Sequence, residues 1–441
     1  MKIAFHTLGC KVNRYESEAI AGLFRKRGHE IVGEGEYADA YVINTCTVTS
    51  VADRKSRQYI RRMKKVNPDS IVAVTGCYAQ TSPDEVASIP GVDVITGTNE
   101  KGRLVDEICD LHEGRLSGER ICIHTAEDLD EFEELGIMQG SQERTRAYIK
   151  VQEGCDRYCS YCVIPYARGP VRSRDLEDIL KEAKSLVSAG YREIVLTGIN
   201  TALYGFERGG RGIEEAVAAV DALEGDFRIR LSSLEPAVVN STYVKELLRY
   251  ERLCHHLHMS AQSGSDSVLR AMNRPYDSKE YYRLVDTLYE FDECYGISTD
   301  MIVGFPGETE ADFRDTCRMV SDCGFCKTHI FKYSKRPMTK AAAMSGQVSP
   351  QVKDKRAGIL RDRAEEAAEK FFIENASAGR REEVLAEEYS PESGCVTGYT
   401  GNYIRTYLEV TPEEGRKLPG KLINVKLTEP YKDGMKGIVV L

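Results

Sequence analysis

Three cysteines, each at the end of a predicted strand, are the feature that most constrains this chain. Three apolar runs within the first 110 residues end in cysteine: residues 2–10 (KIAFHTLGC), 39–46 (DAYVINTC) and 70–77 (SIVAVTGC). Helical segments separate them, and this alternation predicts a doubly wound parallel sheet. Because the carboxyl ends of parallel strands share one edge, Cys10, Cys46 and Cys77 are expected to converge. One such cysteine alone would be read as a small buried hydrophobe, but three in equivalent places predict a metal site.

Length and composition predict an intracellular protein of two or three domains. The chain has 441 residues and 14 cysteines, and it lacks an N-terminal apolar signal core, so metal ligands or buried thiols are more plausible than disulfides. No apolar run is long enough to span a bilayer, so we expect a cytoplasmic protein without membrane contacts. The net charge is −9, so a nucleic acid would have to bind a local basic patch.

A second alternation of strands and helices follows the predicted N-terminal domain of residues 1–125. An acidic stretch, residues 127–136, is interpreted as an exposed, solvated linker. Six strands are expected within a second domain, residues 140–375: 147–153, 193–200, 228–233, 256–260, 298–304 and 329–334. Six βα units are fewer than a closed barrel requires, so we predict an open, partial (βα)6 barrel with its chemistry at the strand carboxyl ends.

The last part of the chain changes pattern. A long charged helix is expected over residues 350–378. Residues 378–441 then show short alternating strands broken by SPESG, YTGN, TPEEG and YKDG, which predicts a small five-stranded β-barrel.

The strongest chemical motif is GCDRYCSYC, directly after the first barrel strand. It places Cys155, Cys159 and Cys162 in a C-x3-C-x2-C loop without a nearby fourth cysteine. Structural zinc sites have four closed ligands, so zinc with a distant fourth cysteine is the weaker alternative. Three thiolates leave one coordination position open. The motif resembles the radical SAM superfamily, whose 4Fe-4S cluster keeps one iron free for S-adenosylmethionine (SAM) and which has an aromatic residue, here Tyr161, before the third cysteine.

Other strand ends match the same superfamily. In related enzymes the second strand end (LTGIN) holds the SAM amino group, and the third (SSLEP) contacts a ribose or methionine moiety. The fourth contributes a glutamine, and the fifth offers backbone to an adenine. The residues that the resemblance assigns to SAM are Gly198, Asn200, Ser233, Glu235, Gln262 and Val303. Each alone could be an ordinary turn residue, and their shared barrel face supports the assignment.

With both triads considered, the whole chain resembles the radical SAM methylthiotransferases. The motifs are TLGCKVN, INTCTV, TGCYAQ, GCDRYCSYCVIPYARGPVRSR and FKYSKRP, with Met338 where that family commonly has glycine. The resemblance implies an auxiliary 4Fe-4S cluster on the first triad, a SAM-binding 4Fe-4S cluster on the second, and a C-terminal RNA-binding TRAM barrel. It also implies a tRNA substrate and an electron donor such as a flavodoxin or ferredoxin.

Within the family, TLGCKVNRYES and FKYSKRP are most similar to the branch acting on N6-threonylcarbamoyladenosine at position 37 of tRNA. The implied reaction is methylthiolation of the adenine C2. The alternatives are the branch acting on isopentenyladenosine, the branch acting on a ribosomal-protein aspartate, and, from another class, a non-catalytic iron-sulfur RNA-binding protein. An open three-cysteine site argues against that last alternative because structural sites are closed.

Several further residues have two interpretations. Cys323 and Cys326 suggest a third cluster but are expected to be buried thiols. Of His255, His256 and His258, only the last two share a strand face, and neutral hydrogen-bonded histidines are the preferred interpretation over a metal site. Tyr399, Tyr403 and Tyr407 could stack bases or pack in the tail barrel.

Basic residues offer candidate RNA contacts. Residues 54–65 (RKSRQYIRRMKK) contain seven basic residues and no acid, and they form either a solvated helix face or a phosphate contact. Five further side chains are predicted to contact RNA or the substrate base: Arg168, Arg172, Arg174, Lys335 and Arg336.

Overall fold

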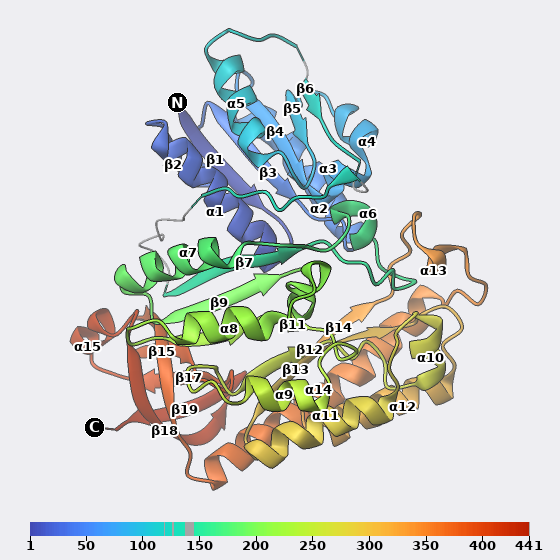
Figure 1. Cartoon of the computed structure of the whole chain (residues 1–441), viewed down its shortest axis with the longest axis vertical. Helices are drawn as coiled ribbons and strands as arrows, with labels where there is room; N and C mark the ends of the chain where they lie inside the picture. The colour runs from blue at the N-terminus through green and yellow to red at the C-terminus, as the bar shows by residue number, and fades with distance from the viewer. Residues whose placement is uncertain (119, 126–127, 137–144, 441) are drawn as a thin grey trace.

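The computed structural model describes residues 1–118, 120–125, 128–136 and 145–440. It contains an N-terminal α/β unit, a central partial barrel and a C-terminal closed β-barrel (Figure 1). None of the helices in these ranges combines the length and apolarity needed to cross a membrane. The domain boundaries stay predictions, and the expected start of the second domain at residue 140 lies outside the described residues.

The N-terminal unit is the expected doubly wound sheet. Its six strands are all parallel and pair in the order β2-β1-β3-β4-β5-β6. The strands are β1 (Lys2–Thr7), β2 (Glu30–Val32), β3 (Ala40–Thr45), β4 (Ile71–Gly76), β5 (Val94–Thr96) and β6 (Arg120–Cys122). The helices are α1 (Lys11–Lys26), α2 (Ser50–Val66), α3 (Cys77–Thr81), α4 (Pro83–Ala87) and α5 (Lys101–His112). Apolar side chains of α1 and α5 cover one face, and those of α2 and α4 cover the other.

The central unit is a partial barrel of six βα steps, as predicted. The strands are β7 (Arg146–Glu153), β8 (Arg172–Ser173), β9 (Glu193–Gly198), β10 (Arg228–Leu231), β11 (Ser233–Leu234), β12 (His256–Met259), β13 (Gly296–Val303) and β14 (Lys327–Lys332). The expected strand 228–233 is divided at Ser232 into β10 and β11. Two sheets, β10-β9-β7-β8 and β11-β12-β13-β14, therefore follow each other around the barrel, and β8 pairs antiparallel with β7.

Two short helices of this unit lie elsewhere: α6 (Ile164–Arg168) packs against α3 of the N-terminal unit, and α13 (Lys340–Ala343) lies in a protruding segment (Figure 1). The other helices cover the outside of the barrel: α7 (Leu176–Ser188), α8 (Ile213–Asp221), α9 (Ser241–Leu247), α10 (Asp266–Ala271), α11 (Ser278–Phe291), α12 (Glu310–Asp322) and the long α14 (Pro350–Ser377). The large apolar core lies between these helices and the strands, so the strand ends and the inner face of the barrel are left for polar residues.

The C-terminal unit is a closed barrel of five strands in the order β15-β16-β17-β19-β18. Its elements are β15 (Arg381–Ser390), β16 (Cys395–Tyr399), β17 (Arg405–Glu409), α15 (Pro412–Lys417), β18 (Leu422–Tyr431) and β19 (Gly434–Val439). The segment TPEEG begins α15 instead of a plain turn, because Thr411 and Glu414 form a capping box.

This small barrel packs against the amino-terminal ends of the central strands. Arg228 donates hydrogen bonds to the carbonyls of Glu383 and Tyr399, both at 2.8 Å. Tyr403 stacks on His256 with ring centroids 4.4 Å apart and on Tyr399 at 5.0 Å. Tyr399 and Tyr403 therefore belong to this interface and are not free platforms for bases.

Candidate active site

The first cysteine triad lies at one edge of the N-terminal sheet. Cys10 precedes α1, Cys46 follows β3, and Cys77 begins α3 directly after β4. Gly9 adopts a φ of +111°, and a Cβ at this position would lie 2.9 Å from the Cys46 Cβ and 3.2 Å from its Sγ. Burial raises the pKa of the Cys46 thiol to about 12, and the nearby Cys77 and Cys10 add to the rise. The three strand ends converge as the topology predicts.

The second triad lies in the loop after β7. The Cys155 amide donates to the Gly169 carbonyl at 3.0 Å, and the Cys162 amide donates to the Cys159 carbonyl at 2.9 Å. Gly154 makes this close return possible, because a Cβ there would lie 1.7 Å from the Pro170 carbonyl oxygen. Burial raises the pKa of the Cys155 thiol to about 11.

Both triads fit a cluster better than a single metal ion. Thiolates bound to one zinc at about 2.3 Å lie only about 3.8 Å apart. Among the described residues, however, neither triad brings its three sulfurs within 4.8 Å of one another. The raised pKa values of the thiols show that bare thiolates are unfavourable here, and iron would supply the missing positive charge.

The predicted SAM contacts gather beside the second triad. The Asn200 amide donates to Glu235 at 2.8 Å, and Arg157 donates to the same carboxylate oxygen at 2.7 Å. Asn200 Oδ1 and Ser232 Oγ are buried without a hydrogen-bond partner, whereas Glu235 Oε1 lies 3.4 Å from the Arg274 guanidinium. Buried polar atoms normally have partners, so the Asn200 and Ser232 oxygens fit a polar ligand such as SAM.

The other predicted SAM contacts are placed by backbone structure. Gln262 has a φ of +66° and pairs through its backbone with Asp300 and Ile302. The Val303 carbonyl accepts the Tyr333 amide at 2.9 Å, and the Ser233 carbonyl accepts the Thr201 hydroxyl at 2.8 Å. Gly198 lies against Gln152, whose side-chain oxygen would be 2.9 Å from a Cβ at that position.

A cavity of about 200 Å³ joins the two halves of the molecule. Tyr161 and Cys162 line it from the second triad, Val48 and Thr49 line it from the segment just after Cys46, and Gln262, Asp300 and residues 331–334 complete the wall. Phe331 is 42% exposed and Val48 is 50% exposed, so apolar surface is open to a ligand here. The cavity thus lies between Cys162 of the second triad and the segment that follows Cys46 of the first.

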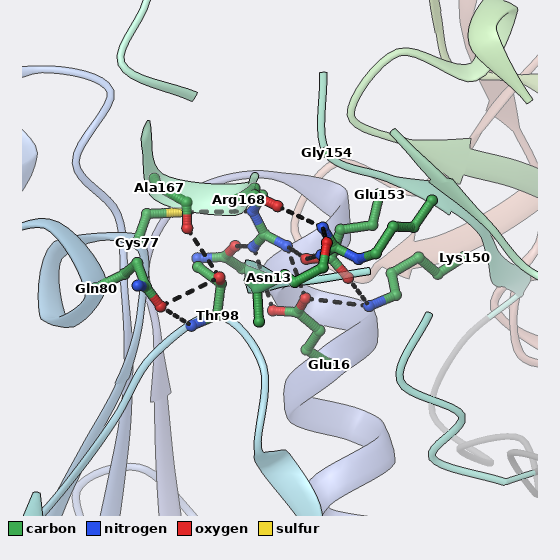
Figure 2. Close-up of polar contacts among 12 residues, drawn as sticks. Asn13, Glu16, Cys77, Gln80, Thr98, Lys150, Glu153, Gly154, Ala167 and Arg168 are labelled. Carbon is green, nitrogen blue, oxygen red and sulfur yellow. Dashed lines mark hydrogen bonds and ion pairs between the residues drawn. The ribbon is translucent and has the colours of Figure 1, made fainter. Parts of the chain in front are cut away.

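A buried ion-pair network connects the N-terminal unit to the barrel (Figure 2). The Arg168 guanidinium donates to Cys77 Sγ at 3.3 Å, to Asn13 Oδ1 at 2.8 Å and to Glu16 at 2.8 Å, and it also contacts Glu153. Lys150 pairs with Glu153 at 2.8 Å and with Glu16 at 3.3 Å (Figure 2). Burial alone would raise the pKa of Glu16, but the neighbouring cations lower it well below its usual value.

Comparison with known proteins identifies the family. Residues 2–97 match the family described as uncharacterized protein family UPF0004, and residues 149–320 match the radical SAM superfamily. The threonylcarbamoyladenosine tRNA methylthiotransferase MtaB of Bacillus subtilis is 40% identical over 98% of this chain and 95% of its own length. This chain belongs to the radical SAM methylthiotransferase family.

The methylthiotransferase is also similar to a second curated relative and to a solved structure. The tRNA-2-methylthio-N(6)-dimethylallyladenosine synthase of Desulfosudis oleivorans is 36% identical over 88% of this chain and 83% of its own length. TsrM of Kitasatospora setae, a radical S-adenosylmethionine methyltransferase solved with cobalamin and a 4Fe-4S cluster, aligns with a TM-score of 0.59. That alignment covers 77% of each chain at 14% identity, so the likeness concerns the fold alone.

The structure does not agree with the prediction that three arginines after the second triad grip RNA. Arg168, Arg172 and Arg174 are almost fully buried. Arg172 donates to the carbonyls of Leu129, Arg168 and Pro170, and Arg174 pairs with Glu134 and Glu182. In the methylthiotransferase Arg168 joins the barrel to the N-terminal unit, and burial keeps all three arginines away from the surface that a phosphate could reach.

Two other sequence interpretations also change. Arg336 is buried and pairs with Asp53 at 2.6 Å, so it is not free to meet a substrate, whereas Lys335 is exposed. The acidic stretch is not a purely solvated linker, because the Glu133 carboxylate accepts the amides of Lys101 and Gly102 at 2.5 and 3.1 Å. Glu127 lies outside the described residues. Acidic composition was a poor guide here because Glu133 and Glu134 meet partners far away in sequence.

The prediction for the remaining cysteine pair agrees with the structure, and the histidines have hydrogen-bond partners. Cys323 and Cys326 are buried in apolar surroundings, and burial raises the pKa of the Cys326 thiol to about 12. His256 and His258 share one strand face, and each contacts the Ser298 hydroxyl at 2.9 Å.

Residues of the methylthiotransferase that sequence reasoning missed include Arg157 and Arg274. Arg157 lies inside the C-x3-C-x2-C loop, so its position was a usable signal. Arg274 lies 3.4 Å from Glu235 and donates to Cys159 Sγ at 3.5 Å, and nothing in its local sequence indicates this role.

Proposed function

We propose that this methylthiotransferase acts in the cytoplasm on tRNA and adds a methylthio group to C2 of N6-threonylcarbamoyladenosine at position 37. The observation that supports it best is the shared cavity, which Cys162 lines from one triad and Val48 and Thr49 line from the segment after Cys46. The B. subtilis relative named for this nucleoside is 40% identical, compared with 36% for the dimethylallyladenosine relative.

The triads Cys155, Cys159, Cys162 and Cys10, Cys46, Cys77 would each hold a 4Fe-4S cluster. When bound and reduced by a flavodoxin or ferredoxin, the clusters and SAM supply radical chemistry at the inert adenine C2–H bond and the sulfur that is inserted. The unpaired oxygens of Asn200 and Ser232 would bind SAM, and the Glu235 carboxylate would face the same ligand. Arg157 and Arg274 would hold the Glu235 carboxylate in place.

The substrate base must enter the cavity out of its stack. Single-stranded loop bases that are splayed out commonly stack on aromatic side chains. Phe331, exposed at the cavity wall on β14, is the aromatic residue that would receive the adenine.

The substrate prediction is tested with two matched tRNAs, one carrying threonylcarbamoyladenosine and one carrying isopentenyladenosine. A pocket that hydrogen-bonds polar groups rejects an analogue lacking them by a factor of about 10⁴. The reconstituted enzyme should therefore methylthiolate the first tRNA and leave the second unmodified, as measured by mass spectrometry of nucleosides. Product on the isopentenyl tRNA alone would move the enzyme to the sister branch.

A second prediction concerns how α2 binds the tRNA backbone. The α2 helix starts at the cavity wall, where the Ser50 amide donates to the Ser334 hydroxyl at 3.1 Å. Arg54, Arg61 and Lys65 are exposed on one side of α2, whereas Arg57 is held by Glu85. Replacing the three exposed residues by glutamine should weaken tRNA binding. The slope of the logarithm of the binding constant against the logarithm of the salt concentration should become shallower by about one per lost phosphate contact.

The matched control removes three exposed cations from α14, a helix that lies away from α2 (Figure 1). Arg361, Arg363 and Lys370 replaced by glutamine should leave the salt dependence unchanged. An equal loss of slope in both triple variants would show that α2 contributes only general charge.

A further inference from the structure

The inner face of the barrel carries a polar cluster that the predicted cluster and SAM contacts do not use. His258 on β12, Asp300 on β13 and His329 on β14 bring one ligand atom each to within 4.8 Å of one another. The Asp300 carboxylate is 3.1 Å from His258 Nε2 and accepts the Ser260 hydroxyl at 2.8 Å. Asp300 also lines the cavity that contains Cys162, so the polar cluster borders the proposed substrate site.

Lys11 brings a positive charge into the same space from the N-terminal unit. It directly follows Cys10 at the start of α1. Its ammonium lies within electrostatic range of side chains on all six main barrel strands: Arg146, Glu193, Arg230, His256, Asp300 and His329. Helix α1 packs against β7 and β9, and Lys11 at its start is partly buried, so these interactions place the ammonium on the barrel side of the helix.

This ammonium lacks a partner of its own. Within the part of the chain that the structure describes, no hydrogen bond or ion pair joins Lys11 to another residue. The neighbouring acids are occupied, because Glu193 is surrounded by Arg146, Arg228 and Arg230 and Asp300 is held by His258 and Ser260. A partly buried, unpaired cation is unfavourable, so a site of this kind fits an anionic ligand.

The same charge argues against a metal ion on His258, Asp300 and His329. A divalent cation there would face a nearby ammonium, and Asp300 already accepts hydrogen bonds from neutral donors. An organic group that carries a carboxylate together with hydroxyl and N–H donors matches both the cation and the hydrogen-bond acceptors of this site. Its carboxylate would pair with Lys11, and its donors would bond to Asp300 and the histidines.

We propose that Lys11 determines substrate specificity by binding the carboxylate of the threonylcarbamoyl group, while the Asp300 wall accepts its hydroxyl and urea N–H groups. This inference rests on the proposed function. The substrate base would then lie between the two triads. Because Lys11 directly follows Cys10, the residue that recognises the N6 substituent would lie next to a cysteine of the first triad.

The test measures binding, without turnover, by the anaerobically reconstituted enzyme lacking a reductant. Three anticodon stem-loops are compared, carrying adenosine, threonylcarbamoyladenosine or its carboxylate methyl ester at position 37. The wild-type enzyme should bind the acid about 10- to 100-fold more tightly than the ester, as expected for a hydrogen bond to a charged group. Lys11→Met should bind acid and ester equally, Lys11→Arg should keep most of the preference, and the exposed-site control Lys26→Met should keep all of it.

The outcomes separate the inference from the proposed function. If the wild-type enzyme does not prefer threonylcarbamoyladenosine to adenosine, the proposed substrate is wrong. If it prefers threonylcarbamoyladenosine but binds acid and ester equally, the Lys11 inference is overturned without any variant. Retention of the full acid preference by Lys11→Met with normal iron content also overturns it.

Discussion

Replacing Cys155, Cys159 and Cys162 together by alanine is expected to remove about half of the bound iron and to abolish SAM cleavage. The reason is that cluster irons are held by thiolates, and this triad is the one beside Asn200 and Glu235. Iron and sulfide analysis after anaerobic reconstitution, with 5′-deoxyadenosine measured by chromatography, checks the result.

The complementary variant changes Cys10, Cys46 and Cys77 to alanine. It should lose the other half of the iron while SAM cleavage without tRNA continues, because the two triads lie on separate units. Cys323→Ala with Cys326→Ala is the matched control, and its iron content should equal that of the wild type since both thiols are buried in apolar cores. Full iron content in either triple variant would contradict the assignment of two clusters.

Replacing Arg168 by methionine is expected to lower the free energy of unfolding by about 3–5 kcal/mol, the usual cost of removing one partner from a buried ion pair. Arg168, Glu16 and Glu153 are fully buried, so the substitution leaves two carboxylates with Lys150 as their main remaining cation. Urea unfolding at neutral pH measures the loss. Arg249→Met removes an exposed pair with Glu246 and should cost less than about 1 kcal/mol.

The loss of stability caused by Arg168→Met should become smaller at low pH. The pKa values of Glu16 and Glu153 are lowered in the folded protein, against the burial that alone would raise them, by Arg168 and Lys150. The contribution of these two carboxylates to the free energy of unfolding is fully present above their unfolded-state pKa of about 4.3. It is lost as pH falls through their pKa in the folded protein. The stability gap between wild type and Arg168→Met should therefore narrow in acid. Adding Glu16→Gln to Arg168→Met should restore part of the lost stability at neutral pH, and no recovery would show that Glu16 is not the group left unpaired.

Local sequence was sufficient for the architecture and for the two cysteine triads. A strand, a turn and a helix are specified by residues close together in the chain, and parallel strands always present their carboxyl ends on one edge. The expected positions of Cys10, Cys46 and Cys77 followed from that rule alone. The C-x3-C-x2-C loop could be recognised from an even shorter segment, because its three cysteines lie within eight residues.

The tertiary structure decided which charged residues are free to meet RNA or substrate. Arg168 meets Glu16 across 152 residues, and Arg336 meets Asp53 across 283. In sequence each of these arginines resembles an RNA contact as closely as the exposed Arg54 or Arg61 does. Nor does anything near Lys11 in sequence show that the helix it begins packs against the barrel strands β7 and β9. A charge acquires its role from the partners and the burial that folding gives it, and those depend on segments that local sequence does not connect.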